Sequence, residues 1–275
     1  MSSAFQDRMA AVRSALFLPA SNPRAMAKAR TLAADLVILD LEDSVAQDAK
    51  DAGRAAALAA AVEGGFPGLL AVRMNGFGTA DHDADRVALA GATGIDLVIL
   101  PKAEEPAPVA ALAEALGKPL LVMIETPVGV LAAAAIAAAP GIAGLIAGTN
   151  DLAATLRLPP GAPRDSLSMS LQAIVLAARA AGVVALDGVW NRLDDPAGFE
   201  AECRAGRMLG FDGKTLIHPA QVEPCNRLFS PDEAEVEEAE ALLAAAVSGA
   251  ERFRGRMVET LHVEQARRML ARAGT

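Results

Sequence analysis

Acidic residues recur directly after short apolar runs in this chain, and they are the residues best suited to chemistry. The set is Asp40, Glu42, Asp43, Glu125, Asp151 and Asp187. Any one of them could simply cap a helix, but several carboxylates facing one another need positive charge to neutralise them. Only Arg73 and Lys102 are at hand, so a divalent cation is the natural complement. Oxygen ligands without a histidine or cysteine cage favour Mg²⁺, with Mn²⁺ as the other choice.

The histidines do not indicate nucleophilic catalysis. His82 lies among aspartates, as at a solvated helix start, His218 follows an apolar run and precedes a proline, and His262 lies in the C-terminal tail. None has a serine or cysteine partner in a recognisable triad arrangement, and the chain has no nucleophile elbow. Segment 76–78 lacks the third glycine of a dinucleotide-binding loop, so no phosphate-cradling loop is predicted.

Eight apolar runs, most of them without polar alternation, must position these side chains. They cover residues 15–19, 36–41, 69–74, 96–100, 120–124, 142–147, 183–187 and 214–217. Such runs are typical of parallel strands covered on both faces. Predicted helices lie between them, at 23–34, 48–62, 106–116, 167–181, 196–209 and 233–246. This alternation predicts an α/β fold, a closed (β/α)₈ TIM barrel, whose polar strand ends share one rim. A doubly wound open sheet is the alternative, because strand number alone does not prove closure.

The chain continues beyond the predicted barrel. Residues 257–273 are predicted to form one more helix, which gives a catalytic barrel domain over 1–250 and a C-terminal helical extension over 251–275. Arg252, Arg254 and Arg256 precede that helix as a basic cluster. This cluster is either a solvated turn or a contact to phosphate or to a neighbouring subunit.

Composition excludes several classes of partner. The net charge is -9 and only 3% of residues are aromatic, so the surface repels phosphate backbones and offers few stacking platforms for nucleic acid. No apolar run is long enough to span a bilayer, and the N-terminus has no signal-peptide core. Cys203 and Cys225 match no metal-site spacing and are expected to be free thiols. We therefore expect a cytoplasmic protein with no membrane and no nucleic-acid partner.

Seven short motifs in a fixed order resemble the citrate lyase β-subunit-like group of the citrate lyase/2-keto-acid aldolase superfamily. They are RSALFLP (13–19), VILDLEDSV (37–45), VRMNG (72–76), LPK (100–102), IETPVGV (124–130), GTNDL (148–152) and GFDGKTLIHPAQV (210–222). Each motif alone is weak, but their order covers nearly the whole chain. Members of the group include citryl-CoA, malyl-CoA and citramalyl-CoA lyases, and the resemblance also implies a (β/α)₈ barrel.

The resemblance implies roles for individual residues near the reacting atoms. Glu125 and Asp151 match the positions that bind Mg²⁺, and Arg73 matches the arginine that holds the carboxylate of the 2-keto acid. Glu42 and Asp43 match the acidic pair beside the metal and are the catalytic candidates on the barrel.

The resemblance also reaches outside the barrel rim. Arg13 and Lys28 match basic positions associated with the CoA end of the substrate. The group often carries Met-Val/Ile-Asp near its C-terminus, where the acid reaches a neighbouring subunit's site; this chain has Glu259 instead of the aspartate. Glu259 is therefore a third catalytic candidate. A homo-oligomer, either a trimer or a dimer of trimers, is expected.

The leading functional prediction is a stand-alone, Mg²⁺-dependent carbon–carbon lyase. It would cleave a malyl-, methylmalyl- or citramalyl-CoA-like thioester into an acyl-CoA and a 2-keto acid. One alternative is a thioesterase that hydrolyses the same substrates. Another is a citryl-thioester lyase subunit that works only inside a citrate lyase complex, on an acyl-carrier protein. A metal-dependent aldolase that uses no CoA is the last.

Overall fold

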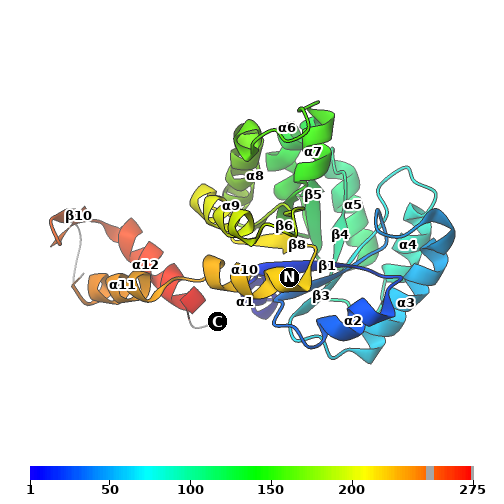
Figure 1. Cartoon of the computed structure of the whole chain (residues 1–275), viewed down its shortest axis with the longest axis horizontal. Coiled ribbons are helices and arrows are strands. Elements are labelled where there is room, and N and C mark those ends of the chain that lie inside the picture. Colours follow the sequence, from blue (N-terminus) through cyan, green and yellow to red (C-terminus); the bar gives the residue numbers. More distant parts are fainter. Residues whose placement is uncertain (246–250, 274–275) are drawn as a thin grey trace.

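Eight parallel strands close into a barrel in the computed structural model, which describes residues 1–245 and 251–273 (Figure 1). Each strand pairs with the next in the chain, and β8 pairs with β1 through Ser14 and Lys214. This last pairing confirms the closed barrel and excludes the open sheet. The strands are β1 (Ser14–Pro19), β2 (Leu36–Asp40), β3 (Leu69–Arg73), β4 (Leu97–Leu100), β5 (Leu120–Ile124), β6 (Ile142–Ala147), β7 (Val184–Asp187) and β8 (Gly213–Leu216).

The strands are apolar throughout because both of their faces are buried. One set of side chains fills the barrel interior, and the alternate set packs against the surrounding helices. A short helix that precedes β1, α1 (Ser3–Ala10), places Met9 in the interior cluster together with Val12. The interior is therefore filled by apolar side chains at the N-terminal end of the barrel.

Helices connect the strands and form the outer layer (Figure 1). The second, α2, ends at Ala29 and not at residue 34 as predicted, because the hydroxyl of Thr31 donates to the carbonyl of Lys28 and terminates it. The helices of the barrel are α2 (Pro23–Ala29), α3 (Lys50–Glu63), α4 (His82–Leu89), α5 (Pro106–Leu116), α6 (Pro127–Ala137), α7 (Thr149–Thr155), α8 (Ser168–Ala181), α9 (Pro196–Leu209) and α10 (Val222–Phe229). Short 3₁₀ helices cover Gln47–Ala49, Arg164–Leu167 and Pro219–Gln221.

The C-terminal segment forms a lobe that projects away from the barrel. In Figure 1, α11 (Glu233–Ala245) and α12 (Thr260–Ala273) lie together at the left, and the two helices pack against each other. The sequence assigned residues 233–245 to the barrel domain and only residues 251–275 to the extension. The predicted boundary itself, residue 250, lies outside the described residues.

The prediction of one continuous helix over 257–273 is wrong at its start. A two-stranded antiparallel sheet, β9 (Glu251–Phe253) and β10 (Arg256–Val258), precedes α12. Arg254 and Gly255 both have positive φ, at 47° and 81°, which is the backbone of a tight hairpin turn. The guanidinium of Arg254 pairs with Glu238 of α11. The side chains of the other two arginines of the predicted basic cluster lie outside the described part of the chain.

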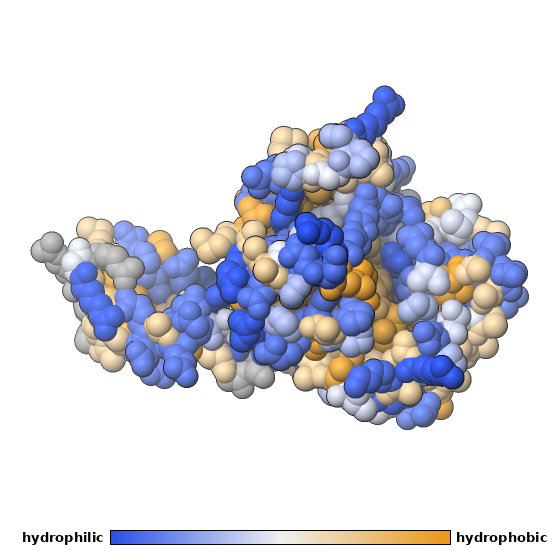
Figure 2. All heavy atoms as spheres, viewed as in Figure 1, coloured by the Kyte–Doolittle hydropathy of each residue, from blue (hydrophilic) through white to orange (hydrophobic). Residues whose placement is uncertain are grey.

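Hydrophilic residues cover most of the face shown in Figure 2, on the barrel and on the C-terminal lobe alike. Among the residues that the structure describes, no helix is both long and apolar enough to cross a membrane.

Candidate active site

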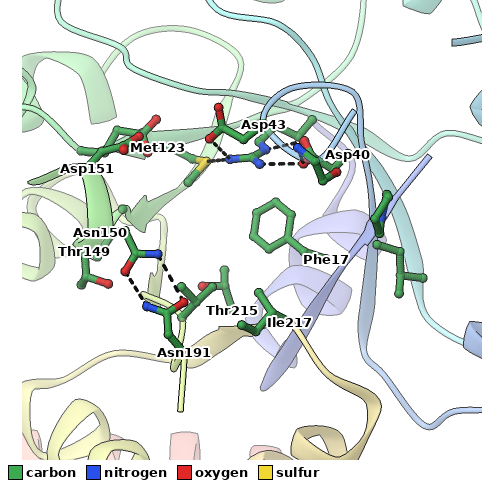
Figure 3. Close-up of a pocket in the computed structure, with 18 residues that line it drawn as sticks. Phe17, Asp40, Asp43, Met123, Thr149, Asn150, Asp151, Asn191, Thr215 and Ile217 are labelled. Atoms are coloured by element: carbon green, nitrogen blue, oxygen red, sulfur yellow. Dashed lines mark hydrogen bonds and ion pairs between the residues drawn. The ribbon is translucent and has the colours of Figure 1, made fainter. Parts of the chain in front are cut away.

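A pocket of about 430 Å³ opens at the carboxyl ends of the barrel strands. In a (β/α)₈ barrel this is the rim at which catalytic side chains gather. Two walls face each other across the pocket: Asp40, Asp43, Met123 and Asp151 lie on one side, and Asn191, Thr215 and Ile217 lie on the other (Figure 3). Phe17, from β1, lies between them.

Arg73, the last residue of β3, is the centre of the charged wall. Its Nε and Nη2 donate to the two carboxylate oxygens of Asp40 at 2.6 and 2.7 Å, and its Nη1 lies 3.0 Å from Glu42 Oε2. Its guanidinium carbon lies 4.8 Å from the centre of the Phe17 ring. Burial alone would lower the pKa of Arg73, but the bonds to Asp40 raise it well above its usual range. Asp40 thus occupies one edge of the guanidinium, and Nη1 lies beside Glu42 and 3.8 Å from Asp43 Oδ2, so a substrate carboxylate would share that end with these two acids.

Glu42 and Asp43 follow β2 and differ strongly in exposure. Glu42 is buried, and its Oε1 accepts a hydrogen bond from Lys102 Nζ at 2.7 Å, whereas the side chain of Asp43 is 62% exposed. Burial raises the pKa of Glu42, although Arg73 and Lys102 oppose that effect. Asp43 is therefore the member of the pair that can contact a ligand directly, whereas Glu42 holds the side chains of Arg73 and Lys102 in place.

Glu125, directly after β5, is the most perturbed acid of the pocket. It is 2% exposed, and its Oε1 accepts a hydrogen bond from the backbone N–H of Lys102 at 2.8 Å. Burial, followed by the charge of Glu42, raises the pKa of Glu125 to about 7. Gly148 packs so closely on this side chain that a Cβ there would lie 2.3 Å from Glu125 Cβ. The glycine of the GTNDL motif is thus required for the carboxylate to sit at the pocket floor.

Asp151 reaches the pocket from the first turn of α7, so that it adds a carboxylate next to Glu125. Its Oδ2 lies 3.6 Å from Lys102 Nζ. Lys102 itself follows β4 and has φ of 51°, a left-handed backbone that costs a non-glycine residue about 1–2 kcal/mol.

The charges of this wall fit a divalent cation. Within the described part of the chain, the five carboxylates Asp40, Glu42, Asp43, Glu125 and Asp151 face two cationic side chains, Arg73 and Lys102, so three negative charges are uncompensated there when all five are ionised. Among the described residues, no three His, Cys, Asp or Glu side chains form a ready cage for a metal ion. A cation at Glu125 and Asp151 would therefore complete its coordination with water and substrate, as Mg²⁺ commonly does.

The opposite wall carries amides and apolar groups. Asn191 Nδ2 donates to Asn150 Oδ1 at 2.7 Å, so the pair closes one side of the pocket (Figure 3). Sequence reasoning missed Phe17, Met123, Asn191 and Thr215 as lining residues. The alternation of side chains along a strand could have identified three of these residues. Phe17, Met123 and Thr215 are inward-facing side chains of β1, β5 and β8, and they lie where the barrel core ends, just below the rim. Asn191 lies in a loop, and nothing in its neighbourhood marked it.

Two other predicted rim residues serve the frame of the barrel. Asp187, at the end of β7, is fully buried and accepts hydrogen bonds from Arg164 and Lys214 at 2.8 and 3.0 Å, on the side of the strands that faces the helices. It does not join the acidic wall. His218 caps the 3₁₀ helix at Pro219–Gln221 by accepting from the N–H of Ala220.

Arg13 lies away from the pocket of its own chain, and its predicted role at the CoA end stays a prediction. Arg13 directly precedes β1 and its guanidinium holds both carboxylate oxygens of Asp35, which precedes β2. Both residues lie at the N-terminal end of the barrel, opposite the pocket, because strand starts gather there. The Arg13–Asp35 ion pair therefore links the start of β1 to the start of β2.

Lys28 and Glu259 do not line the pocket of the chain. Lys28 is exposed in the last turn of α2. Glu259 is exposed at the start of α12, where its N–H donates to His262 Nδ1, in the lobe away from the barrel. A role for Glu259 in catalysis thus requires a pocket other than that of its own chain.

Comparison with known proteins points to one family. Residues 13–219 match the model described as HpcH/HpaI aldolase/citrate lyase. A Cereibacter sphaeroides protein named (3S)-malyl-CoA thioesterase is 44% identical over 271 residues, 95% of this chain and 94% of that protein. A Mycobacterium tuberculosis citrate lyase subunit beta-like protein is 41% identical over 266 residues, 94% of each. The crystal structure of CitE from M. tuberculosis in complex with magnesium, acetoacetate and coenzyme A has a TM-score of 0.83 and 38% identity, over 96% of this chain and 98% of that one.

Proposed function

The chain belongs to the HpcH/HpaI aldolase/citrate lyase family, and we propose that it is a Mg²⁺-dependent carbon–carbon lyase that acts on a malyl-CoA-like thioester. Such a substrate carries a carboxylate and a hydroxyl on adjacent carbons, next to the acyl-CoA part. Cleavage gives an acyl-CoA and a 2-keto acid; malyl-CoA itself would yield acetyl-CoA and glyoxylate. The observation that carries the proposal is the wall of five carboxylates around Arg73 and Lys102.

The relatives support the choice of cation and substrate. The M. tuberculosis CitE structure holds magnesium, acetoacetate and coenzyme A, and a second one holds magnesium and pyruvate. Pyruvate is a 2-keto acid, the chemical class that the lyase reaction releases, whereas acetoacetate is a 3-keto acid that also carries a carboxylate and a carbonyl. We therefore assign Mg²⁺ to Glu125 and Asp151 and the keto-acid carboxylate to the neighbourhood of Arg73.

Each group of the wall then has a task. Mg²⁺, when bound, lowers the pKa of the substrate hydroxyl and stabilises the negative charge that forms on its oxygen. Arg73 holds the substrate carboxylate through the guanidinium end that carries Nη1, and the stacked Phe17 ring keeps that end in place. The thioester carbonyl accepts the electrons of the broken bond, so no organic cofactor is needed. Asp43, the exposed acid, takes the proton of the substrate hydroxyl, and the acyl carbon then receives a proton from Asp43 or from Glu259 of a neighbouring chain.

Hydrolysis is the second candidate, and one observation favours it. The relative named (3S)-malyl-CoA thioesterase covers almost the whole chain at 44% identity. In that reaction water attacks the thioester carbonyl, with malate and free CoA as the products. The same wall would hold the malyl carboxylate, and Asp43 would take the proton from water.

A product assay separates the two reactions. Purified protein is mixed with malyl-CoA and Mg²⁺, and glyoxylate, acetyl-CoA and free thiol are each quantified over time. The lyase predicts glyoxylate and acetyl-CoA in equal amounts with no free thiol. Free thiol formed together with malate would establish hydrolysis instead, and the absence of every product across malyl-, methylmalyl- and citramalyl-CoA would refute both.

A further inference from the structure

Lys102 contacts both assigned cation ligands and the acidic pair beside them. Its backbone N–H donates to Glu125 Oε1 at 2.8 Å, and its Nζ lies 2.7 Å from Glu42 Oε1. The same ammonium lies 3.8 Å from Asp43 Oδ1 and 3.6 Å from Asp151 Oδ2. One residue therefore joins the loops that follow β2, β4 and β5 to the first turn of α7.

The backbone of Lys102 makes this double contact possible. With φ at 51°, the chain turns sharply after β4, so that the N–H and the side chain of one residue both face acids of the wall. Glycine would adopt this conformation more easily than lysine. A lysine at such a position indicates that its ammonium has a task at the site.

The ammonium occupies a region that a divalent cation would share. It pairs with Glu42 and lies within 4 Å of Asp43 and Asp151, and the last of these is an assigned ligand of the cation. Two positive charges a few ångströms apart repel each other, the more so in a partly buried site. Lys102 and the cation therefore compete for Asp151.

Building on the proposed function, we propose that Lys102 is a positioning residue that holds the place of the cation. Its ammonium keeps Glu42, Asp43 and Asp151 gathered in the metal-free protein, and the cation binds by displacing it from Asp151. The carboxylates of the acidic wall are thus held in place before the cation binds. Because the cation must displace the ammonium, its affinity for the site is lowered.

The direct test is Mn²⁺ binding without substrate, followed by electron paramagnetic resonance of the free ion. Lys102→Met removes the charge and keeps the stem, whereas Lys102→Gly removes the charge and relieves the left-handed backbone. Both should bind Mn²⁺ about tenfold more tightly than the wild type, because one repelling charge is gone. Lys102→Arg keeps the charge and should stay within about threefold.

A matched control comes from the other end of the barrel. Lys118 donates to the carbonyls of Ala92 and Ile95, just before β5, and Lys118→Met should leave Mn²⁺ affinity unchanged. Unchanged or weaker affinity in both Lys102→Met and Lys102→Gly would overturn the inference, as would an equal tightening in Lys102→Arg. If the wild type binds no Mn²⁺, the proposed function fails as well, so the two failures are distinguishable.

Discussion

At the scale of single residues, the charged side chains of the pocket form ion pairs with one another. The sequence predicts that Arg73 holds the carboxylate of the 2-keto acid, yet Asp40 already accepts hydrogen bonds from its Nε and Nη2. Lys102 was noted only as a source of positive charge, yet both its backbone and its side chain contact acids. Sequence patterns identified which residues meet at the rim, but not their pairing, which depends on side-chain directions in the folded barrel.

The raised pKa of Glu125 predicts how cation affinity depends on pH. Because burial and Glu42 raise that pKa to about 7, a proton competes with the cation for this carboxylate near neutral pH. Mg²⁺ affinity should therefore fall as the pH drops through about 7, which calorimetric titration at several pH values would measure. A pH-independent affinity between about pH 6 and pH 8 would contradict the assignment of Glu125 as a ligand.

The same shift has a consequence for stability. A carboxyl whose pKa is higher in the folded than in the unfolded protein stabilises the fold at low pH, and this contribution is lost as the pH rises through the folded value. The melting temperature of the metal-free protein should thus decline between about pH 5 and about pH 8. Mg²⁺ should reduce the decline, and Glu125→Gln should remove the part that depends on this residue.

Arg73 is predicted not to tolerate lysine. Lysine has the charge but not the planar fork, so Arg73→Lys should weaken binding of the keto acid by about 1.5–3 kcal/mol. Inhibition constants for glyoxylate or pyruvate in both proteins measure this directly. Arg13→Lys is the matched control, since Arg13 pairs with Asp35 at the opposite end of the barrel. Equal inhibition of the wild type and Arg73→Lys would remove Arg73 from the substrate site.

At the scale of secondary structure, the sequence predicted the strands best. Continuous burial on both faces leaves an apolar run that ends where the strand ends, so β5 and β6 match their predicted bounds and the ends of the other six strands differ by at most one residue. The tail was harder, because the hairpin before α12 depends on the positive φ of Arg254 and Gly255, and only the glycine is a turn signal.

The start of α7 depends on one glycine. Because a Cβ at position 148 would overlap Glu125 Cβ, Gly148→Ala should force either the helix start or the carboxylate to move. We expect a loss of about 1–3 kcal/mol in the free energy of unfolding, as for an overpacked core, together with weaker Mg²⁺ binding. Gly76→Ala is the control, because its Cβ would make only ordinary contacts with Pro101, at 3.6 Å from Cγ and 3.9 Å from the carbonyl oxygen. Wild-type stability and Mg²⁺ affinity in Gly148→Ala would show that the contact is not as tight as described.

At the scale of the whole molecule, the C-terminal lobe projects away from the barrel that contains the pocket, and Glu259 belongs to this lobe (Figure 1). We propose that the protein is a trimer, or a dimer of trimers, in which the lobe covers the pocket of a neighbour. The lobe already has exposed apolar side chains, Met257 and Leu261, that a neighbour could cover. Sedimentation at micromolar concentration should show a trimer or hexamer, and a monomer would refute the proposal.

Glu259 is predicted to act only across such an interface. If it exchanges a proton with the substrate of a neighbour, Glu259→Gln should lower turnover by about 10²-fold or more, with little change in melting temperature. Glu264→Gln, an equally exposed change on α12, should leave the rate unchanged. A wild-type rate in Glu259→Gln at saturating thioester and Mg²⁺ would show that Glu259 has no catalytic role and only precedes its helix.

The central claim is that cleavage of a malyl-CoA-like thioester depends on a divalent cation held by Glu125 and Asp151. The most direct measurement is the rate of malyl-CoA consumption by chelator-treated protein during titration with Mg²⁺. We predict no consumption before Mg²⁺ is added, full recovery in the wild type and in Glu114→Gln, an exposed control on α5, and no recovery in Glu125→Gln. Rapid consumption by chelator-treated wild-type protein, or full recovery in Glu125→Gln, would contradict it.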